Sequence, residues 1–207
     1  MNIARILYPI EVLGYGKRVG IWFAGCPHKC ISCSNPELWE KECQYEITPE
    51  NLMSLINDIC SRNTVDGFTI TGGEPFFQSN DLDRLTAELG KINNDILVYS
   101  GYTLKELQAM QNESVDRVLA RIAVLIDGRY IESKNNGAFL RGSDNQKVYI
   151  MNGKYELRYD SYLKKTVNEI QNFSTDSGIV SVGIHNPGFK KTFDEAVPKK
   201  GLVDKNE

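Results

Sequence analysis

The hydrophobic pattern along the chain alternates between short apolar runs and longer segments with one apolar face. Runs rich in β-branched and aromatic residues predict buried strands at residues 18–25, 66–71, 95–99 and 121–127. Between them, apolar residues at helical spacing predict helices from Thr48 to about Arg62, from Asp81 to about Lys91, and from Leu104 to about Gln111. This alternation indicates right-handed βαβ units around a parallel sheet.

The predicted fold class is α/β, an incomplete (βα) barrel of about six parallel strands. A closed eightfold barrel usually needs about 250 residues, whereas this chain has 207, so we expect one open side. Each predicted strand ends in glycine or polar residues: Gly25-Cys26, Thr71-Gly72-Gly73, Ser100-Gly101 and Asp127-Gly128. In such folds the ligand site lies at the carboxyl ends of the strands.

The composition of the sequence changes after Asn135, where residues typical of turns become frequent. Residues 147–151, 155–159 and 179–184 have the composition of further strands. A weak helix is expected from Phe189, followed by a frayed tail to Glu207. Nothing indicates a separate domain, so we expect a single domain over 1–207, with a core at about 1–150 and these additions over 151–207.

Composition and charge exclude several classes of protein. Hydrophobic residues make up 41% and charged residues 25% of the chain, as in ordinary globular proteins and unlike collagen or disordered chains. The net charge of −3 gives no sign of the basic stripe that nucleic-acid binding requires. No apolar run approaches the length of about 20 residues that spans a membrane, and no signal-peptide core is recognisable. We therefore expect a cytoplasmic protein with no nucleic-acid or membrane partner.

Three of the five cysteines are packed into a short segment with the spacing C-x3-C-x2-C, namely Cys26, Cys30 and Cys33. In a reducing compartment, clustered thiols indicate metal or redox chemistry rather than disulfides. A [4Fe–4S] cluster normally takes four cysteines, so three would leave one iron without a protein ligand. An open coordination position is where a substrate or cofactor binds a metal.

A structural zinc site is the alternative interpretation of this loop, with His28 or Cys43 near enough in sequence to supply a fourth ligand. Zinc ribbons, however, usually present two separated cysteine pairs. Cys60 lies within a predicted amphipathic helix and is expected to be a core residue, because buried cysteines behave as small apolar side chains. Cys43 is expected to be the same.

A second motif, Thr71-Gly72-Gly73-Glu74-Pro75, follows the second predicted strand. Glycines let backbone groups approach a ligand closely, and the Glu74 carboxylate would suit an ammonium group. By itself this motif is more typical of a tight turn than of a binding site. Its significance comes from its position one βα unit after the cysteine loop, on the same predicted edge of the sheet.

Together, the two motifs resemble those of the radical S-adenosylmethionine superfamily. The resemblance implies that Cys26, Cys30 and Cys33 hold a [4Fe–4S] cluster, and that the Gly72–Glu74 segment binds the amino group of S-adenosylmethionine. Further segments are similar to glycyl-radical-enzyme activases, most of all to those that serve anaerobic ribonucleotide reductase: Gly25-Cys26-Pro27-His28, Asn35-Pro36-Glu37-Leu38-Trp39, Tyr99-Ser100-Gly101-Tyr102, and residues 125–130 and 141–146. The resemblance covers about residues 1–150.

The activity implied by this resemblance begins with reduction of the cluster by a flavodoxin- or ferredoxin-like donor. Reductive cleavage of S-adenosylmethionine then gives a 5′-deoxyadenosyl radical, which takes a hydrogen atom from a glycine of a partner enzyme. The resemblance also implies that Asp127 organises the methionine carboxylate through a monovalent cation, and Ser100 could contact the methionine end. Asp127 before Gly128 is also typical of a simple turn. No catalytic residue of the chain itself is assigned.

Two other functions remain open from the sequence. One is a radical enzyme that acts on a small molecule or peptide, in the manner of the 7-carboxy-7-deazaguanine synthases. The other is a zinc-binding adaptor without enzymatic activity. Asn145 and Gln146 belong either to a solvated loop or to the mouth of the site, and His185 is expected to be a surface residue.

Overall fold

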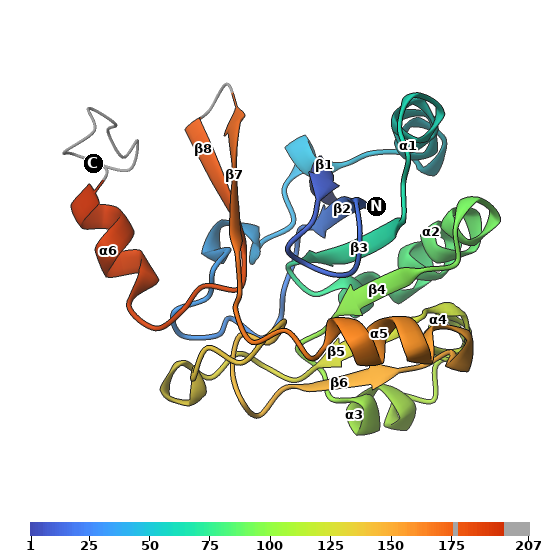
Figure 1. Cartoon of the computed structure of the whole chain (residues 1–207). Helices are drawn as coiled ribbons and strands as arrows, with labels where there is room; N and C mark the ends of the chain where they lie inside the picture. Colours follow the sequence, from blue (N-terminus) through green and yellow to red (C-terminus); the bar gives the residue numbers. More distant parts are fainter. Residues whose placement is uncertain (176–177, 197–207) are drawn as a thin grey trace.

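The computed structural model describes residues 1–175 and 178–196, and its centre is a six-stranded sheet in the order β1-β2-β3-β4-β5-β6 (Figure 1). The strands are β1 (Ile3–Ile10), β2 (Arg18–Phe23), β3 (Gly67–Gly72), β4 (Ile96–Tyr99), β5 (Val124–Asp127) and β6 (Lys147–Ile150). The predicted α/β class is confirmed. Every strand lies beside the next one in the chain, as expected for consecutive βα units.

Only the strands β2 to β5 are parallel, so the expectation of about six parallel strands is wrong. β1 pairs antiparallel with β2, and β6 pairs antiparallel with β5. A parallel connection needs a crossover of a dozen or more residues, usually with a helix. The link between β1 and β2 is too short for one, and the link from β5 to β6 contains only a 3-10 turn at Glu132–Lys134.

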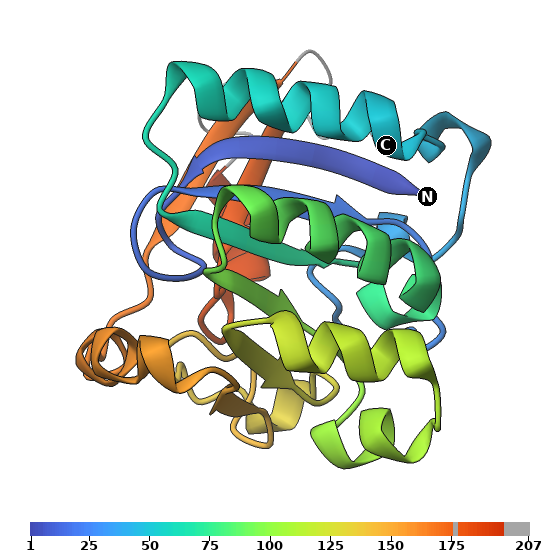
Figure 2. The same cartoon turned by 90° about the vertical axis from the view of Figure 1, so that its right-hand side faces the viewer.

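Four helices cover one face of the sheet, where Figure 2 shows them in front of the strands. They are α1 (Pro49–Arg62), α2 (Ser79–Ile92), α3 (Leu104–Ala109) and α4 (Glu113–Arg121). Helix α1 begins where the sequence predicts, after Thr48, whose side chain accepts a hydrogen bond from Asn51 N. Helix α4 is a correction, because Arg121 was expected to begin a strand and instead ends this helix.

The main core lies between these helices and the sheet. Its fully buried side chains come from alternate positions of the strands and from the inner faces of the helices. They include Val19, Ile21 and Phe23 of β2, Phe68 and Ile70 of β3, Leu52 and Ile56 of α1, and Leu82, Leu85 and Leu89 of α2. Cys60 packs against this core, as expected.

The opposite face of the sheet is covered by α5 (Glu156–Tyr162) and by a hairpin of β7 (Ile170–Thr175) and β8 (Gly178–Gly183). The predicted strand at 155–159 is wrong. Tyr155, Tyr159 and Tyr162 are buried against Leu97, Val124 and Ile126, which requires the spacing of a helix rather than of a strand. The hairpin buries Val182 against Ile10, Leu13 and Trp22.

A buried polar network lies at the amino ends of the strands. The side chains of Arg18 and Asp95 are both completely buried, with Nη1 and Oδ1 3.1 Å apart. Arg18 Nε also donates to Thr69 Oγ1 (2.7 Å). From α5, the Tyr159 hydroxyl donates to Asp95 Oδ1 (2.6 Å) and Arg158 pairs with Oδ2 (2.8 Å). This network attaches α5 to the sheet.

The last described element is α6 (Phe189–Ala196), which agrees with the helix expected from Phe189. The expected frayed tail at 197–207 lies outside the described residues. Within the described part of the chain, no helix has both the length and the apolarity needed to cross a membrane.

Candidate cluster and cofactor site

The cysteine loop leaves the end of β2 and is closed at its base by backbone hydrogen bonds. Gly25 N donates to Leu38 O and Cys26 N donates to Trp39 O, both at 2.8 Å. Leu38 is completely buried in the core beneath the hairpin. Because these bonds join the two ends of the loop, Cys26, Cys30 and Cys33 lie on one closed segment.

Within this loop the three thiols are half-buried. Lys29 and Ser32 have left-handed backbone conformations, with φ of 45° and 56°, which are uncommon for residues other than glycine. Burial raises the pKa of the Cys26 thiol, and it also raises that of Cys30, with the neighbouring Cys33 adding to both effects. The thiols must therefore lose protons when they take up iron.

The Gly-Gly-Glu segment is joined to the start of the cysteine loop. Gly73 N donates to Phe23 O (2.7 Å) and Glu74 N donates to Gly25 O (2.9 Å). A Cβ atom added to Gly73 would lie 2.5 Å from the carbonyl oxygen of Gly25, which is too close for any side chain. The glycines are thus required by the neighbouring backbone, and the Gly73 carbonyl accepts no hydrogen bond from the described residues.

The Glu74 carboxylate is completely buried and held by protein donors. Oε1 accepts from Phe76 N and from Ser100 Oγ, both at 3.0 Å, and Oε2 accepts from Gly101 N at 2.6 Å. These bonds connect the end of β3 to the end of β4. The side chain therefore serves the structure, and a ligand amine would meet the backbone of this segment.

Ser100 and Asp127 are also buried and tied to backbone groups. Ser100 Oγ accepts from Tyr102 N (3.1 Å) in addition to its bond to Glu74. Asp127 Oδ2 accepts from Leu104 N (2.6 Å) and Oδ1 from Lys147 N (3.2 Å). The structure brings Ser100 into contact with the Gly-Gly-Glu segment, while Asp127 links the end of β5 to the starts of α3 and β6.

Other residues singled out in the sequence have structural contacts. Gln146 accepts from the backbone N–H groups of Gly142 and Ser143 and donates to Gly128 O, so its loop is ordered by its own side chain. His185 is half-buried and stacks on Phe189 with ring centroids 4.0 Å apart. Cys43 is exposed, so its expected place in the core is wrong.

His28 is the residue that sequence reasoning missed, because it was considered only as a zinc ligand. Its side chain is 4% exposed, and Nε2 lies 3.2 Å from Glu74 Oε2. His28 and Glu74 are far apart in the sequence, and no local sequence pattern predicts their contact.

The donor set of the loop fits an iron–sulfur cluster. Within residues 1–175 and 178–196, no three His, Cys, Asp or Glu side chains are gathered closely enough to hold a single metal ion. Cysteine thiolates are the usual ligands of iron–sulfur clusters, and the loop supplies three of them. The indole N–H of Trp39 is buried and donates no hydrogen bond to any described residue; the carbonyl of the same residue accepts from Cys26 N. Sulfur atoms of clusters accept such bonds.

Comparisons with known proteins agree with this donor set. A family model described as a 4Fe-4S single cluster domain matches residues 12–149. The anaerobic ribonucleoside-triphosphate reductase-activating protein of Escherichia coli K12 is 34% identical over 152 residues, which cover 69% of this chain and 94% of that protein. The chain belongs to the radical S-adenosylmethionine activases.

Three further matches are less similar. The bacteriophage T4 protein of the same name is 30% identical over 72% of this chain and 94% of its own. The pyruvate formate-lyase-activating enzyme of Staphylococcus aureus USA300 is 26% identical over 70% of this chain and 60% of its own. A crystal structure of QueE from Escherichia coli has a TM-score of 0.42 and 24% identity, over 49% of this chain and 52% of that one. This activase is an enzyme whose cofactors are a [4Fe–4S] cluster and S-adenosylmethionine.

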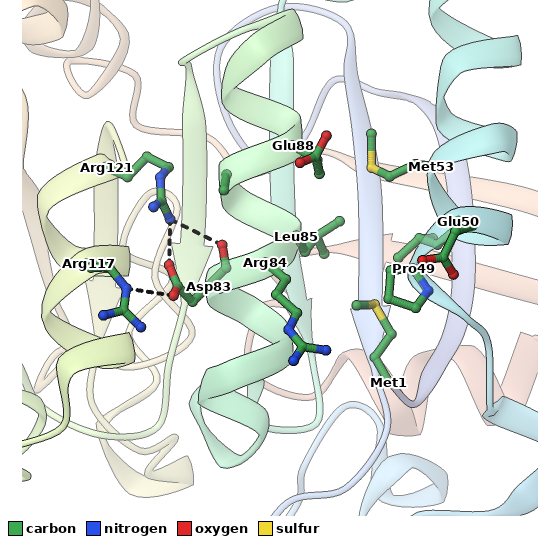
Figure 3. Close-up of a pocket in the computed structure, with 12 residues that line it drawn as sticks. Met1, Pro49, Glu50, Met53, Asp83, Arg84, Leu85, Glu88, Arg117 and Arg121 are labelled. Atoms are coloured by element: carbon green, nitrogen blue, oxygen red, sulfur yellow. Dashed lines mark hydrogen bonds and ion pairs between the residues drawn. The ribbon is translucent and has the colours of Figure 1, made fainter.

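A groove of about 600 Å³ lies away from this site. Figure 3 shows it on the helical face, where it is bordered by α1, α2 and α4. One wall is an ion-pair cluster in which Asp83 meets Arg117 (2.8 Å) and Arg121 (3.0 Å). None of the predicted site residues lines it.

Proposed function

We propose that this activase installs a glycyl radical in a partner enzyme, and that the partner is an anaerobic ribonucleotide reductase. The observation that carries the proposal is the backbone connection between the C-x3-C-x2-C loop and the Gly-Gly-Glu segment. An iron site and an amine site on adjacent, hydrogen-bonded segments are what a chelated amino acid group requires. The similarity to reductase-activating proteins supports the choice of partner.

In this proposal Cys26, Cys30 and Cys33 each bind one iron and leave the fourth for the amino acid end of S-adenosylmethionine. Gly72, Gly73 and Glu74 receive its amino group. When bound, the reduced cluster would supply one electron to the sulfonium of S-adenosylmethionine, whose C–S bond would break to give methionine and a 5′-deoxyadenosyl radical. That radical would take a hydrogen atom from the partner's glycine, leaving 5′-deoxyadenosine and the glycyl radical.

Around this centre, Ser100 and Asp127 hold the strand ends that face the methionine end of the cofactor. A monovalent cation beside Asp127 would let its carboxylate organise the methionine carboxylate. A carboxylate has about four acceptor positions, and Asp127 uses two of them on backbone N–H groups.

The remaining parts of the proposal concern access. The sheet forms an incomplete barrel within one domain, and its open side admits the partner's glycine loop. Residues 151–207 add the α5 and hairpin cover to that domain. The electron comes from a flavodoxin- or ferredoxin-like donor.

The test is electron paramagnetic resonance on anaerobically reconstituted, dithionite-reduced protein, with and without S-adenosylmethionine. We expect a [4Fe–4S]⁺ signal that changes shape when the cofactor is added. Addition of an anaerobic ribonucleotide reductase should then produce a glycyl radical signal.

Each part of the proposal would be contradicted by a different result. A cluster signal that ignores the cofactor would contradict the assignment of Gly72–Glu74. Cofactor cleavage with no radical on the reductase, but with turnover of a small heterocycle, would favour a small-molecule enzyme. One zinc ion in place of iron and sulfide would contradict the whole proposal.

A further inference from the structure

The Glu74 carboxylate has one acceptor position that is not filled by a standard hydrogen bond. A carboxylate offers about four such positions, and Phe76 N, Ser100 Oγ and Gly101 N take three. The nearest further donor is His28 Nε2, 3.2 Å from Oε2. That nitrogen is buried and makes no well-aligned hydrogen bond to any described residue.

The His28 ring is held in a matching space. A Cβ atom added to Gly101 would lie 2.3 Å from its Cδ2 atom. The ring also packs edge-on against Tyr102, with centroids 4.4 Å apart and an interplanar angle of 71°. His28 therefore inserts from the cysteine loop into a gap at the end of β4 that a glycine leaves open. Since the ring already lies within hydrogen-bond distance of Oε2, a small rotation would align it with that oxygen.

We propose that His28 is a positioning residue that locks the cysteine loop to the Gly72–Glu74 segment and the end of β4. This inference rests on the proposed function. Under that function, the cysteine loop holds the iron that binds S-adenosylmethionine, and the Gly72–Glu74 segment holds the amino group of the same molecule. The distance between the loop and the segment must therefore stay fixed. A misplacement of about 1 Å is enough to weaken a site that depends on two such contacts.

The test compares His28→Phe with the wild-type protein and with His185→Phe as a matched control. Phenylalanine keeps a ring over Gly101 and Tyr102 but removes the nitrogen that faces Glu74. His185 is the other histidine of the chain, half-buried and stacked on Phe189. The quantity measured is the concentration of S-adenosylmethionine at which half of the reduced-cluster resonance signal has changed to its cofactor-bound shape. Iron content and the signal without cofactor are measured on the same samples.

We expect His28→Phe to load iron like wild type and to give the same signal before the cofactor is added. Half-conversion should require about tenfold more S-adenosylmethionine, which is equivalent to about 1.4 kcal/mol. His28→Gln, which restores an N–H donor, should recover most of the affinity. His185→Phe should leave the titration unchanged.

A second variant reaches the same contact without altering His28. Gly101→Ala places a methyl group where the ring lies, so it should weaken cofactor binding like His28→Phe. Combined with His28→Ala, it should add little to the effect of His28→Ala alone, because both disrupt one contact.

An unchanged titration in both His28→Phe and Gly101→Ala would overturn the assignment. Loss of iron in proportion to loss of cofactor response would also overturn it, since His28 would then stabilise the cluster itself. If wild type showed no cofactor response, the proposed function would fail and this inference with it, whereas failure of the variants alone leaves that function standing.

Discussion

At the scale of single residues, the buried Arg18–Asp95 pair is a contact that could not be predicted from the sequence. The two residues are separated by 77 positions, and each resembles an ordinary polar residue at the edge of a strand. Glycines and cysteines were easier to interpret, because their spacing alone restricts what they can do. Residues such as Arg18 and His28 acquire a role only through partners that the fold brings to them.

Arg18→Met should therefore destabilise the protein strongly. Removing one partner of a buried pair leaves an uncompensated charge and typically costs about 3–5 kcal/mol. The matched control is Arg62→Met, whose ion pair with Asp58 is exposed and should contribute no more than about 1 kcal/mol. Urea unfolding followed by circular dichroism measures both, and equal losses would contradict the structural importance of Arg18.

At the scale of elements, the helices expected from Thr48, Asp81 and Leu104 were predicted within a few residues. Strands β1 and β7 were not predicted, and two further segments were misjudged. Residues 113–121 carry apolar side chains at helical spacing but follow another short helix closely, so α4 was overlooked. Residues 155–159 contain aromatic residues typical of strands. There the burial of Tyr155, Tyr159 and Tyr162 against the sheet outweighed local preference. Sequence pattern also gave no warning that the two edge strands are antiparallel.

Helices α2 and α4 are joined by Asp83, whose ion pairs give their contact a pH dependence. Burial alone would raise the pKa of Asp83, but hydrogen bonds from Arg117 and Arg121 outweigh it and lower that pKa below 3.8. A carboxyl with a lowered pKa in the folded state stabilises it fully above its ordinary pKa. This contribution is lost as the pH falls through the lower, folded-state value.

Asp83→Asn should accordingly lower the free energy of unfolding at pH 7 by about 1–2 kcal/mol. The difference from wild type should shrink as the pH falls below the ordinary aspartate pKa, and it should disappear below the lowered folded-state pKa, where the wild-type carboxyl is protonated in both states. Thermal unfolding at a series of pH values checks this, with the exposed Asp58→Asn as control. A difference that stays constant down to pH 3 would show that the carboxylate charge is not responsible.

At the scale of the whole molecule, one face of the sheet depends on residues outside the family match. That match ends at residue 149, yet α5 and the β7–β8 hairpin cover the sheet face opposite the four helices. The expected core of about 1–150 therefore contains the predicted site residues, but it lacks the elements that cover one face of the sheet. Comparison with shorter sequences could not reveal this cover.

Two truncated chains distinguish the contribution of α5 to stability from that of the β7–β8 hairpin. A chain ending at residue 166 keeps α5 and the bond from Tyr159 to Asp95, so it should still unfold cooperatively. A chain ending at residue 151 exposes Leu97, Val124 and Ile126, and it should lose cooperative unfolding and bind a hydrophobic dye. Cooperative unfolding of the shorter chain at the wild-type temperature would contradict this division.

The closed base of the cysteine loop has a consequence for exposure to air. The bonds from Gly25 to Leu38 and from Cys26 to Trp39 involve only backbone atoms, so the two ends of the loop are joined without any side chain. Burial raises the pKa values of the Cys26 and Cys30 thiols, and a protonated thiol oxidises more slowly than a thiolate. Loss of iron to oxygen should therefore leave the two ends of the loop joined, ready to be reloaded with iron and sulfide.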